Sequence, residues 1–111
     1  MNVKIIPSAE FDCCFRRLAK KYKSLPADYL LFSKELKKNP LQGRDLGSGV
    51  RKIRMAIGSK GRGKSGGARV LTLNVLVSEN AEVTLLTIYD KSEMGNISDE
   101  YLKWLISEAK K

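Results

Sequence analysis

The sequence predicts one domain of the α+β class, with its elements in the order β-α-α-β-β-β-α. The chain has 111 residues, a usual length for one domain, and 42% of them are hydrophobic, enough for one core. Apolar residues recur at helical spacing in the first third of the chain and again near its end. Between these regions lie three runs of apolar and β-branched residues that are typical of strands.

A short strand and two helices are expected first. Asn2–Ile6 has the character of a strand, and Ser8 is a suitable N-cap for the helix that follows. That helix carries one apolar stripe, formed by Phe11, Cys14, Phe15, Leu18 and Tyr22. After a break at Ser24–Pro26, a second helix is expected over Ala27–Lys38. The link between them is short, so the two helices should pack as an antiparallel hairpin.

Three strands are expected in the second half. Leu41–Gly49 contains three glycines and is predicted to be a loop. Val50–Ile57 alternates apolar and basic side chains, as a half-buried strand does, which places Lys52 and Arg54 together on the exposed face. The other two strands are Arg69–Val77 and Val83–Tyr89.

A last helix is expected after Ser98, which is a suitable N-cap. Asp99 and Glu100 follow in its first turn, where negative charge is favoured. Ile97 and Leu102 are spaced to form a hydrophobic staple across the cap. These elements fill the chain, so residues 1–111 are predicted to be a single domain.

Positive charge is concentrated in the middle of the chain. The formal net charge is +9, and residues 46–78 carry seven basic side chains and no acidic one. A solvated surface seldom excludes one sign of charge over such a length, so nucleic acid, an acidic protein or a membrane surface is the expected partner. Basic residues also cover the polar sides of both predicted helices, where they could face solvent, RNA or a partner.

Several classes of protein are disfavoured. No apolar run approaches the roughly 20 residues that span a bilayer. The start of the chain lacks the features of a secretion signal, so a cytoplasmic location is expected. Cys13 and Cys14 are adjacent and badly placed to pair, and the chain has no histidine to complete a zinc site. No metal or other cofactor is predicted.

The loop from Gly58 to Arg69 contains five glycines and four lysines or arginines. Its first part, Gly58–Ser65, matches the GxxxxGK[ST] phosphate-binding loop of nucleotide hydrolases. That mechanism requires a helix directly after the loop, whereas a strand follows here, so nucleotide hydrolysis is not expected. A mobile loop that contacts phosphates is expected instead. Its base should lie on the same side of the sheet as Lys52 and Arg54, and its basic residues are Lys60, Arg62, Lys64 and Arg69. The alternative is a flexible hairpin tip whose charge serves solubility.

Catalysis would have to use lysine, arginine or tyrosine, because the basic stretch has no carboxylate and the chain no histidine. Neighbouring cations favour loss of a proton from a lysine, which makes Lys52 or Lys64 a candidate proton carrier. Arg54 and Arg69 could stabilise the charge that develops on a pentavalent phosphate. RNA would supply its own nucleophile, the 2′-hydroxyl. The residues alone leave binding and cleavage equally open.

Three segments resemble the HigB-like branch of the RelE toxins, the ribonucleases of bacterial toxin–antitoxin modules: NPLQG (Asn39–Gly43), VRKIRMAIGSKGRGKSGGARV (Val50–Val70) and LLTIYDKSE (Leu85–Glu93). The resemblance implies a twisted antiparallel sheet with the helical hairpin on one side and an mRNA-binding face on the other. It implies cleavage of mRNA in the ribosomal A site by 2′-hydroxyl attack. It also implies a cognate helix-turn-helix antitoxin, whose complex with the toxin represses their operon.

The resemblance assigns catalytic positions to Lys52, Arg54, Arg69 and Lys91. A catalytic tyrosine of the best-known member falls at Ile97 here, and Tyr89 is the nearest substitute. Arg51, Lys60, Arg62 and Lys64 are the expected RNA-binding residues.

Two alternatives remain. A gyrase-inhibiting toxin of the ParE type shares the fold but needs no basic site at these positions. A non-catalytic RNA- or ribosome-binding module would show no toxicity.

Overall fold

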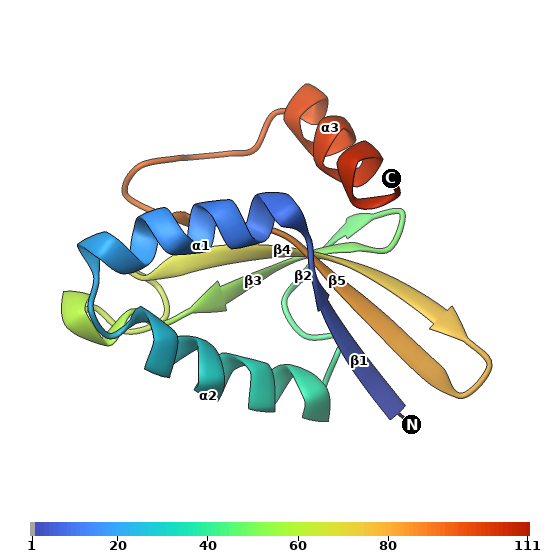
Figure 1. Cartoon of the computed structure of the whole chain (residues 1–111), viewed down its shortest axis with the longest axis horizontal. Helices are drawn as coiled ribbons and strands as arrows, with labels where there is room; N and C mark the ends of the chain where they lie inside the picture. Colours follow the sequence, from blue (N-terminus) through green and yellow to red (C-terminus); the bar gives the residue numbers. More distant parts are fainter. Residues whose placement is uncertain (1) are drawn as a thin grey trace.

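The computed structural model describes residues 2–111, so Met1 of the predicted domain lies outside the described part. It is a small α+β domain with the predicted order of elements and one additional strand (Figure 1). The elements are β1 (Asn2–Pro7), α1 (Ala9–Lys21), α2 (Leu25–Lys38), β2 (Arg44–Gly47), β3 (Val50–Met55), the 3-10 helix η1 (Gly58–Lys60), β4 (Ala68–Val77), β5 (Asn80–Asp90) and α3 (Asp99–Ala109).

The strands form one five-stranded sheet in the order β1-β5-β4-β3-β2. The pairs β5–β4 and β4–β3 are antiparallel, as expected, and so is the unexpected pair β3–β2, but β1 runs parallel to β5. The sheet is therefore mixed, and the expectation of an antiparallel sheet is wrong at this edge. β1 and β5 come from opposite ends of the chain, so no local sequence pattern determines their relative direction.

The additional strand, β2, lies inside the segment that was predicted to be a loop. All four of its residues are exposed, so the segment has no apolar alternation that would indicate a strand. Ser48 and Gly49, which connect β2 to β3, both have positive φ angles, of 55° and 82°, as a type I′ turn requires. Gly43 lies so close to β3 that a Cβ atom on it would be 2.5 Å from the carbonyl oxygen of Lys52. A glycine there allows β2 to approach β3.

The helix caps are those that the sequence predicts. Ser8 Oγ accepts a hydrogen bond from the Phe11 amide at 3.1 Å, and Ser98 Oγ accepts one from the Tyr101 amide at 3.1 Å. α2 begins at Leu25, two residues earlier than predicted, because proline is compatible with the first turn of a helix. α1 and α2 run in opposite directions, as the short link between them predicts (Figure 1). No helix within residues 2–111 has the length and apolar character needed to cross a membrane.

Two hydrophobic clusters lie on the two faces of the sheet. The larger cluster joins the α1–α2 hairpin to one face and includes Phe11, Phe32, Leu36, Ile53, Val70, Val83, Leu85 and Ile88. The smaller cluster joins α3 to the other face and includes Val50, Leu71, Leu86, Tyr89 and Leu105. Ile97 and Leu102 pack against the smaller cluster, where a hydrophobic staple was expected. The α3 cluster covers only part of its sheet face, and the rest of that face is available for a site.

Candidate functional site

A cavity of about 590 Å³ opens where the end of β3, the start of β4 and the end of β5 meet. Six of its lining side chains are cationic, and none is an aspartate or glutamate. The predicted catalytic residues all line it. Its lining consists of Gln42, Gly43, Arg44, Lys52, Ile53, Arg54, Lys64, Arg69, Tyr89, Lys91, Met94, Gly95 and Asn96.

Strand register brings three of these residues into one row. Arg54 on β3 pairs with Arg69 on β4, and Arg69 pairs with Tyr89 on β5. Residues that are directly opposite in an antiparallel pair share a face of the sheet, with Cβ atoms about 5 Å apart. The two arginines and the tyrosine therefore lie side by side on the face that carries α3.

A β-bulge in β5 is what places Tyr89 in this row. Leu71 pairs with Thr87 and Thr72 pairs with Leu85, so Leu86 is an extra residue in the ladder. Before the bulge Val83 and Leu85 point into the hairpin cluster, and strict alternation would send Tyr89 to the same side. The extra residue reverses the alternation, so Tyr89 packs in the α3 cluster beside the cavity.

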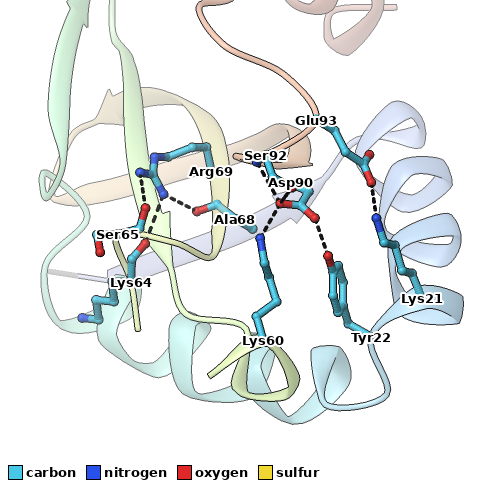
Figure 2. Close-up of polar contacts among 10 residues, drawn as sticks. All are labelled: Lys21, Tyr22, Lys60, Lys64, Ser65, Ala68, Arg69, Asp90, Ser92 and Glu93. Atoms are coloured by element: carbon cyan, nitrogen blue, oxygen red, sulfur yellow. Dashed lines mark hydrogen bonds and ion pairs between the residues drawn. The ribbon is translucent and has the colours of Figure 1, made fainter. Parts of the chain in front are cut away.

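Arg69 has only 6% of its surface exposed, although it lines the cavity. Its guanidinium donates hydrogen bonds to the carbonyl oxygens of Lys64, Ser65 and Ala68 at 3.0–3.1 Å (Figure 2). Burial, together with the neighbouring charge of Arg54, lowers the pKa of Arg69 from its usual value, yet an arginine stays protonated in proteins. Three of its five N–H groups are used, so the others can donate to a ligand.

Tyr89 contributes a buried hydroxyl that has no hydrogen-bond partner within residues 2–111. Only 7% of the residue is exposed. Burial raises the pKa of Tyr89, and the adjacent Arg69 charge opposes that shift. A buried polar group without a partner is costly, and such groups are often satisfied by a ligand or ordered water. The hydroxyl therefore belongs to a residue that lines the cavity, and its hydrogen-bonding capacity is unused.

Most other cations of the cavity have no carboxylate partner within the described part of the chain. Lys52, Arg54 and Lys91 form no salt bridge within the described part of the chain. Lys64 Nζ lies 3.1 Å from a carboxylate oxygen of Glu35, but both side chains are more than half exposed, so solvent weakens this pair. The cavity consequently has a strong net positive charge.

Three of the four expected RNA-binding residues do not line the cavity, and two of them are engaged within the protein. Arg51 points to the opposite side of β3, where it donates to the carbonyl oxygens of Gln42 and Gly43 and so supports the segment that forms one wall. Lys60 lies with its ammonium 2.8 Å from Asp90 Oδ1, and its side chain is 12% exposed (Figure 2). Both cations are engaged inside the protein. Arg62 is exposed on the loop but does not line the cavity.

The glycine-rich loop is anchored rather than free at its start. Its first turn is η1, where the amides of Gly58 and Ser59 donate to the side chains of Asp28 and Ser24. At the other end, the amide of Lys91 donates to the carbonyl oxygen of Gly67. Hydrogen bonds therefore hold both ends of the loop that was expected to be mobile. These bonds involve Ser24 and Asp28 at the start of α2 and Lys91 just after β5, all of which are distant from the loop in the sequence.

Several residues of the site were not expected from the sequence. Gln42, Arg44, Met94, Gly95 and Asn96 line the cavity from β2 and the segment just before it, and from the connection between β5 and α3. Asp90 is 1% exposed and is the acceptor for Lys60, Tyr22 and Ser92. The segments NPLQG and LLTIYDKSE contain Gln42 and Asp90, but nothing in their local pattern indicates these contacts.

The arrangement can bind an anion and stabilise added negative charge. Cations and hydrogen-bond donors that converge on a partly enclosed space suit a phosphodiester, whose charge increases during cleavage. Proton transfer would fall to lysine or tyrosine, since the lining has no histidine or carboxylate. Within residues 2–111, no three histidine, cysteine, aspartate or glutamate side chains lie together in a way that could hold a metal ion.

A small α+β domain with a cationic cavity over its sheet is thus suited to binding a polyanion. Comparison with family models identifies the family: residues 12–111 match the model described as "RelE toxin of RelE / RelB toxin-antitoxin system". The chain belongs to this family and is therefore a toxin of a toxin–antitoxin module. Toxins of this family typically inhibit translation by cleaving mRNA, engage the ribosome and have a cognate antitoxin.

Proposed function

We propose that this chain is a ribosome-dependent endoribonuclease that cleaves mRNA in the ribosomal A site. The observation that carries the proposal is the cavity itself, where Lys52, Arg54, Arg69 and Lys91 meet the partnerless hydroxyl of Tyr89 without any carboxylate. A gyrase inhibitor has no need for such a site. A module that only binds RNA has no need for a buried, unsatisfied hydroxyl.

In the proposed reaction, the scissile phosphate binds between Arg54 and Arg69. The RNA 2′-oxygen attacks phosphorus, and the bond from phosphorus to the 5′-oxygen of the next nucleotide breaks. The products are a 2′,3′-cyclic phosphate and a free 5′-hydroxyl. Because the RNA supplies the nucleophile, no metal-bound water is needed to attack phosphorus. The two guanidiniums stabilise the extra negative charge on the pentavalent phosphate, which is where electrostatic catalysis is most effective.

One proton must leave the 2′-hydroxyl and one must reach the departing 5′-oxygen. Tyr89 and Lys52 are our candidates for these transfers, because both line the cavity on the same face as Arg54. Lys91 adds positive charge at the end of β5. Lys64 and Arg62, on the loop, are proposed to hold flanking phosphates.

The remaining proposals follow from the toxin–antitoxin assignment. The partner is a cognate helix-turn-helix antitoxin, and contact with operator DNA occurs only through the toxin–antitoxin complex. The protein acts in the cytoplasm, where mRNA and ribosomes are found.

The decisive experiment is to map mRNA 5′ ends after brief induction of the chain in bacteria. Growth arrest with new 5′-hydroxyl ends inside reading frames is expected. Arg54→Ala should abolish both effects, because Arg54 is proposed to stabilise the charge on the pentavalent phosphate. Arg54 is exposed, so its loss should leave the fold intact. Lys103→Ala is the matched control, since it removes one exposed cation on α3, away from the cavity.

The competing functions predict different results. DNA-damage signalling without new mRNA ends would indicate a gyrase inhibitor. Normal growth of cells that express the chain without an antitoxin would indicate a harmless binding module. In either case the nuclease proposal would be wrong.

A further inference from the structure

The most densely bonded polar group outside the cavity is the carboxylate of Asp90, the last residue of β5. It accepts hydrogen bonds from Tyr22 Oη at 2.6 Å, from Lys60 Nζ at 2.8 Å, and from the amide and hydroxyl of Ser92 at 3.0 and 2.8 Å (Figure 2). We call these four residues the Asp90 cluster. They join the end of α1, the glycine-rich loop and the end of β5 at one point.

The Asp90 cluster lies on the opposite face of the sheet from the cavity, yet it is adjacent to the cavity in the chain. Tyr89 and Lys91, the neighbours of Asp90, both line the cavity. Because successive strand residues point to opposite faces, Asp90 points toward the hairpin when Tyr89 points toward the cavity. Fixing the carboxylate on one face therefore fixes the backbone that presents Tyr89 and Lys91 on the other.

The cluster also determines where the negative charge of Asp90 lies. Asp90 is the pairing partner of Ala68, next to Arg69, and a free carboxylate here would attract the cations of the cavity. Lys60 neutralises it, and the Lys60 ammonium also lies 5.8 Å from the centre of the Tyr22 ring. Paired in this way, Asp90 does not compete with a phosphate for Arg69 or Lys91.

We propose that Lys60 and Tyr22 are positioning residues for the phosphate site, which act through Asp90 to hold Tyr89 and Lys91 in place and to keep the carboxylate away from the cavity. The inference rests on the proposed function, in that it takes the cavity to be a phosphodiester site. Lys60 then serves RNA cleavage without contacting RNA.

Two measurements test the proposal. The first is cleavage of mRNA on programmed ribosomes, with the single-turnover rate and KM determined separately. The second is an NMR titration of the isolated protein with inorganic phosphate, followed at the backbone amides of Arg69, Tyr89 and Lys91. Lys60→Met and Asp90→Asn should each lower the cleavage rate and the phosphate affinity about tenfold or more, since small misplacements of catalytic groups are costly.

Variants nearby supply the controls. Lys21→Met also removes one lysine charge beside the Tyr22 ring, but from the end of α1. There Lys21 pairs with Glu93 at 2.7 Å, and both side chains of that pair are about half exposed. This variant should cleave and bind phosphate as the unaltered protein does. Lys60→Arg keeps a positive charge beside Asp90 and should retain both activities to within about threefold. Tyr22→Phe removes one hydrogen bond and should give a milder loss, in a protein that still folds.

The double variant Lys60→Met/Asp90→Asn should be no worse than the more damaged single variant, because the two residues act as a unit. The inference is overturned if Lys60→Met and Asp90→Asn melt at lower temperature but, when folded, cleave and bind phosphate normally. If the unaltered protein binds phosphate in this way but never cleaves mRNA, the proposed function is wrong. The positioning role of the Asp90 cluster is then judged by phosphate affinity alone.

Discussion

Arg54 and Arg69 face each other directly across the β3–β4 pair, although like charges in that position repel. Neither forms a salt bridge within residues 2–111 that would relieve the repulsion. Burial of Arg69 increases the cost, because Arg69 is then less well solvated than Arg54. A bound phosphate would relieve this repulsion. The arginine pair therefore lowers the stability of the free protein, as is expected of a site that binds an anion.

Arg54→Ala should therefore stabilise the free protein while it abolishes cleavage. The expected gain is about 0.5 kcal/mol in the free energy of unfolding, the usual size of an unfavourable cross-strand pair. Urea unfolding with and without added phosphate checks this, since phosphate should stabilise the unaltered protein more than the variant. A variant that is less stable in phosphate-free buffer would show that Arg54 has a structural role we have not identified.

Arg69 should behave differently, because it also supports the loop. Arg69→Ala leaves three carbonyl oxygens without their donor, and we expect a loss of roughly 2–4 kcal/mol in the free energy of unfolding. Arg69→Lys keeps the charge but cannot reproduce the planar fork, so its stability should lie between the two. Chemical denaturation of the three proteins gives the comparison. Equal stability of Arg69→Ala and the unaltered protein would show that the loop does not depend on these bonds.

Tyr89→Phe separates the two roles that a buried tyrosine can have. The hydroxyl has no partner, so its removal should leave stability unchanged or raise it by about 1 kcal/mol. If the hydroxyl transfers a proton, single-turnover cleavage on ribosomes should fall about 100-fold or more. Tyr101→Phe is a matched control, because the Tyr101 hydroxyl already lies within bonding distance of Glu10 and Thr87. Normal cleavage by Tyr89→Phe would assign Tyr89 to the core alone.

The parts of the fold that depend on local chemistry could be predicted from the sequence. The N-caps at Ser8 and Ser98 follow from side-chain type, and the alternation around Lys52 and Arg54 gives the strand face that they share. The meeting of these two with Arg69 could also be expected, because strands that are consecutive in the chain usually pair.

What the sequence does not show are the relationships that depend on partners far along the chain. The bulge at Leu86 exists only relative to β4, and without it Tyr89 would be assigned to the hairpin face. From the sequence, Lys60 is indistinguishable from the other cations of the loop. Its role is visible only in the fold, where it lies beside Tyr22 and Asp90. β2 has no buried face, so only its pairing with β3 reveals it.

The stability of the protein should depend on Asp90 in a particular range of pH. Burial disfavours the charged carboxylate, but hydrogen bonds from Lys60, Tyr22 and Ser92 outweigh it and hold the pKa of Asp90 well below its usual range. An unfolded aspartate has a pKa of about 3.9, so the folded state binds fewer protons between that value and the lower folded pKa. The stabilisation from Asp90 is thus complete above about pH 4 and is lost as the pH falls further.

Asp90→Asn should cost about 3 kcal/mol near neutral pH, because it leaves the Lys60 ammonium without its counter-ion. The difference between this variant and the unaltered protein should narrow as the pH falls below about 4, because the unfolded aspartate then binds a proton that the folded one does not. Urea unfolding at a series of pH values measures the difference directly. Glu79→Gln, which removes an exposed carboxylate from the turn between β4 and β5, serves as the control and should follow the unaltered protein throughout. A difference for Asp90→Asn that stays constant down to low pH would mean that the Asp90 charge does not stabilise the fold.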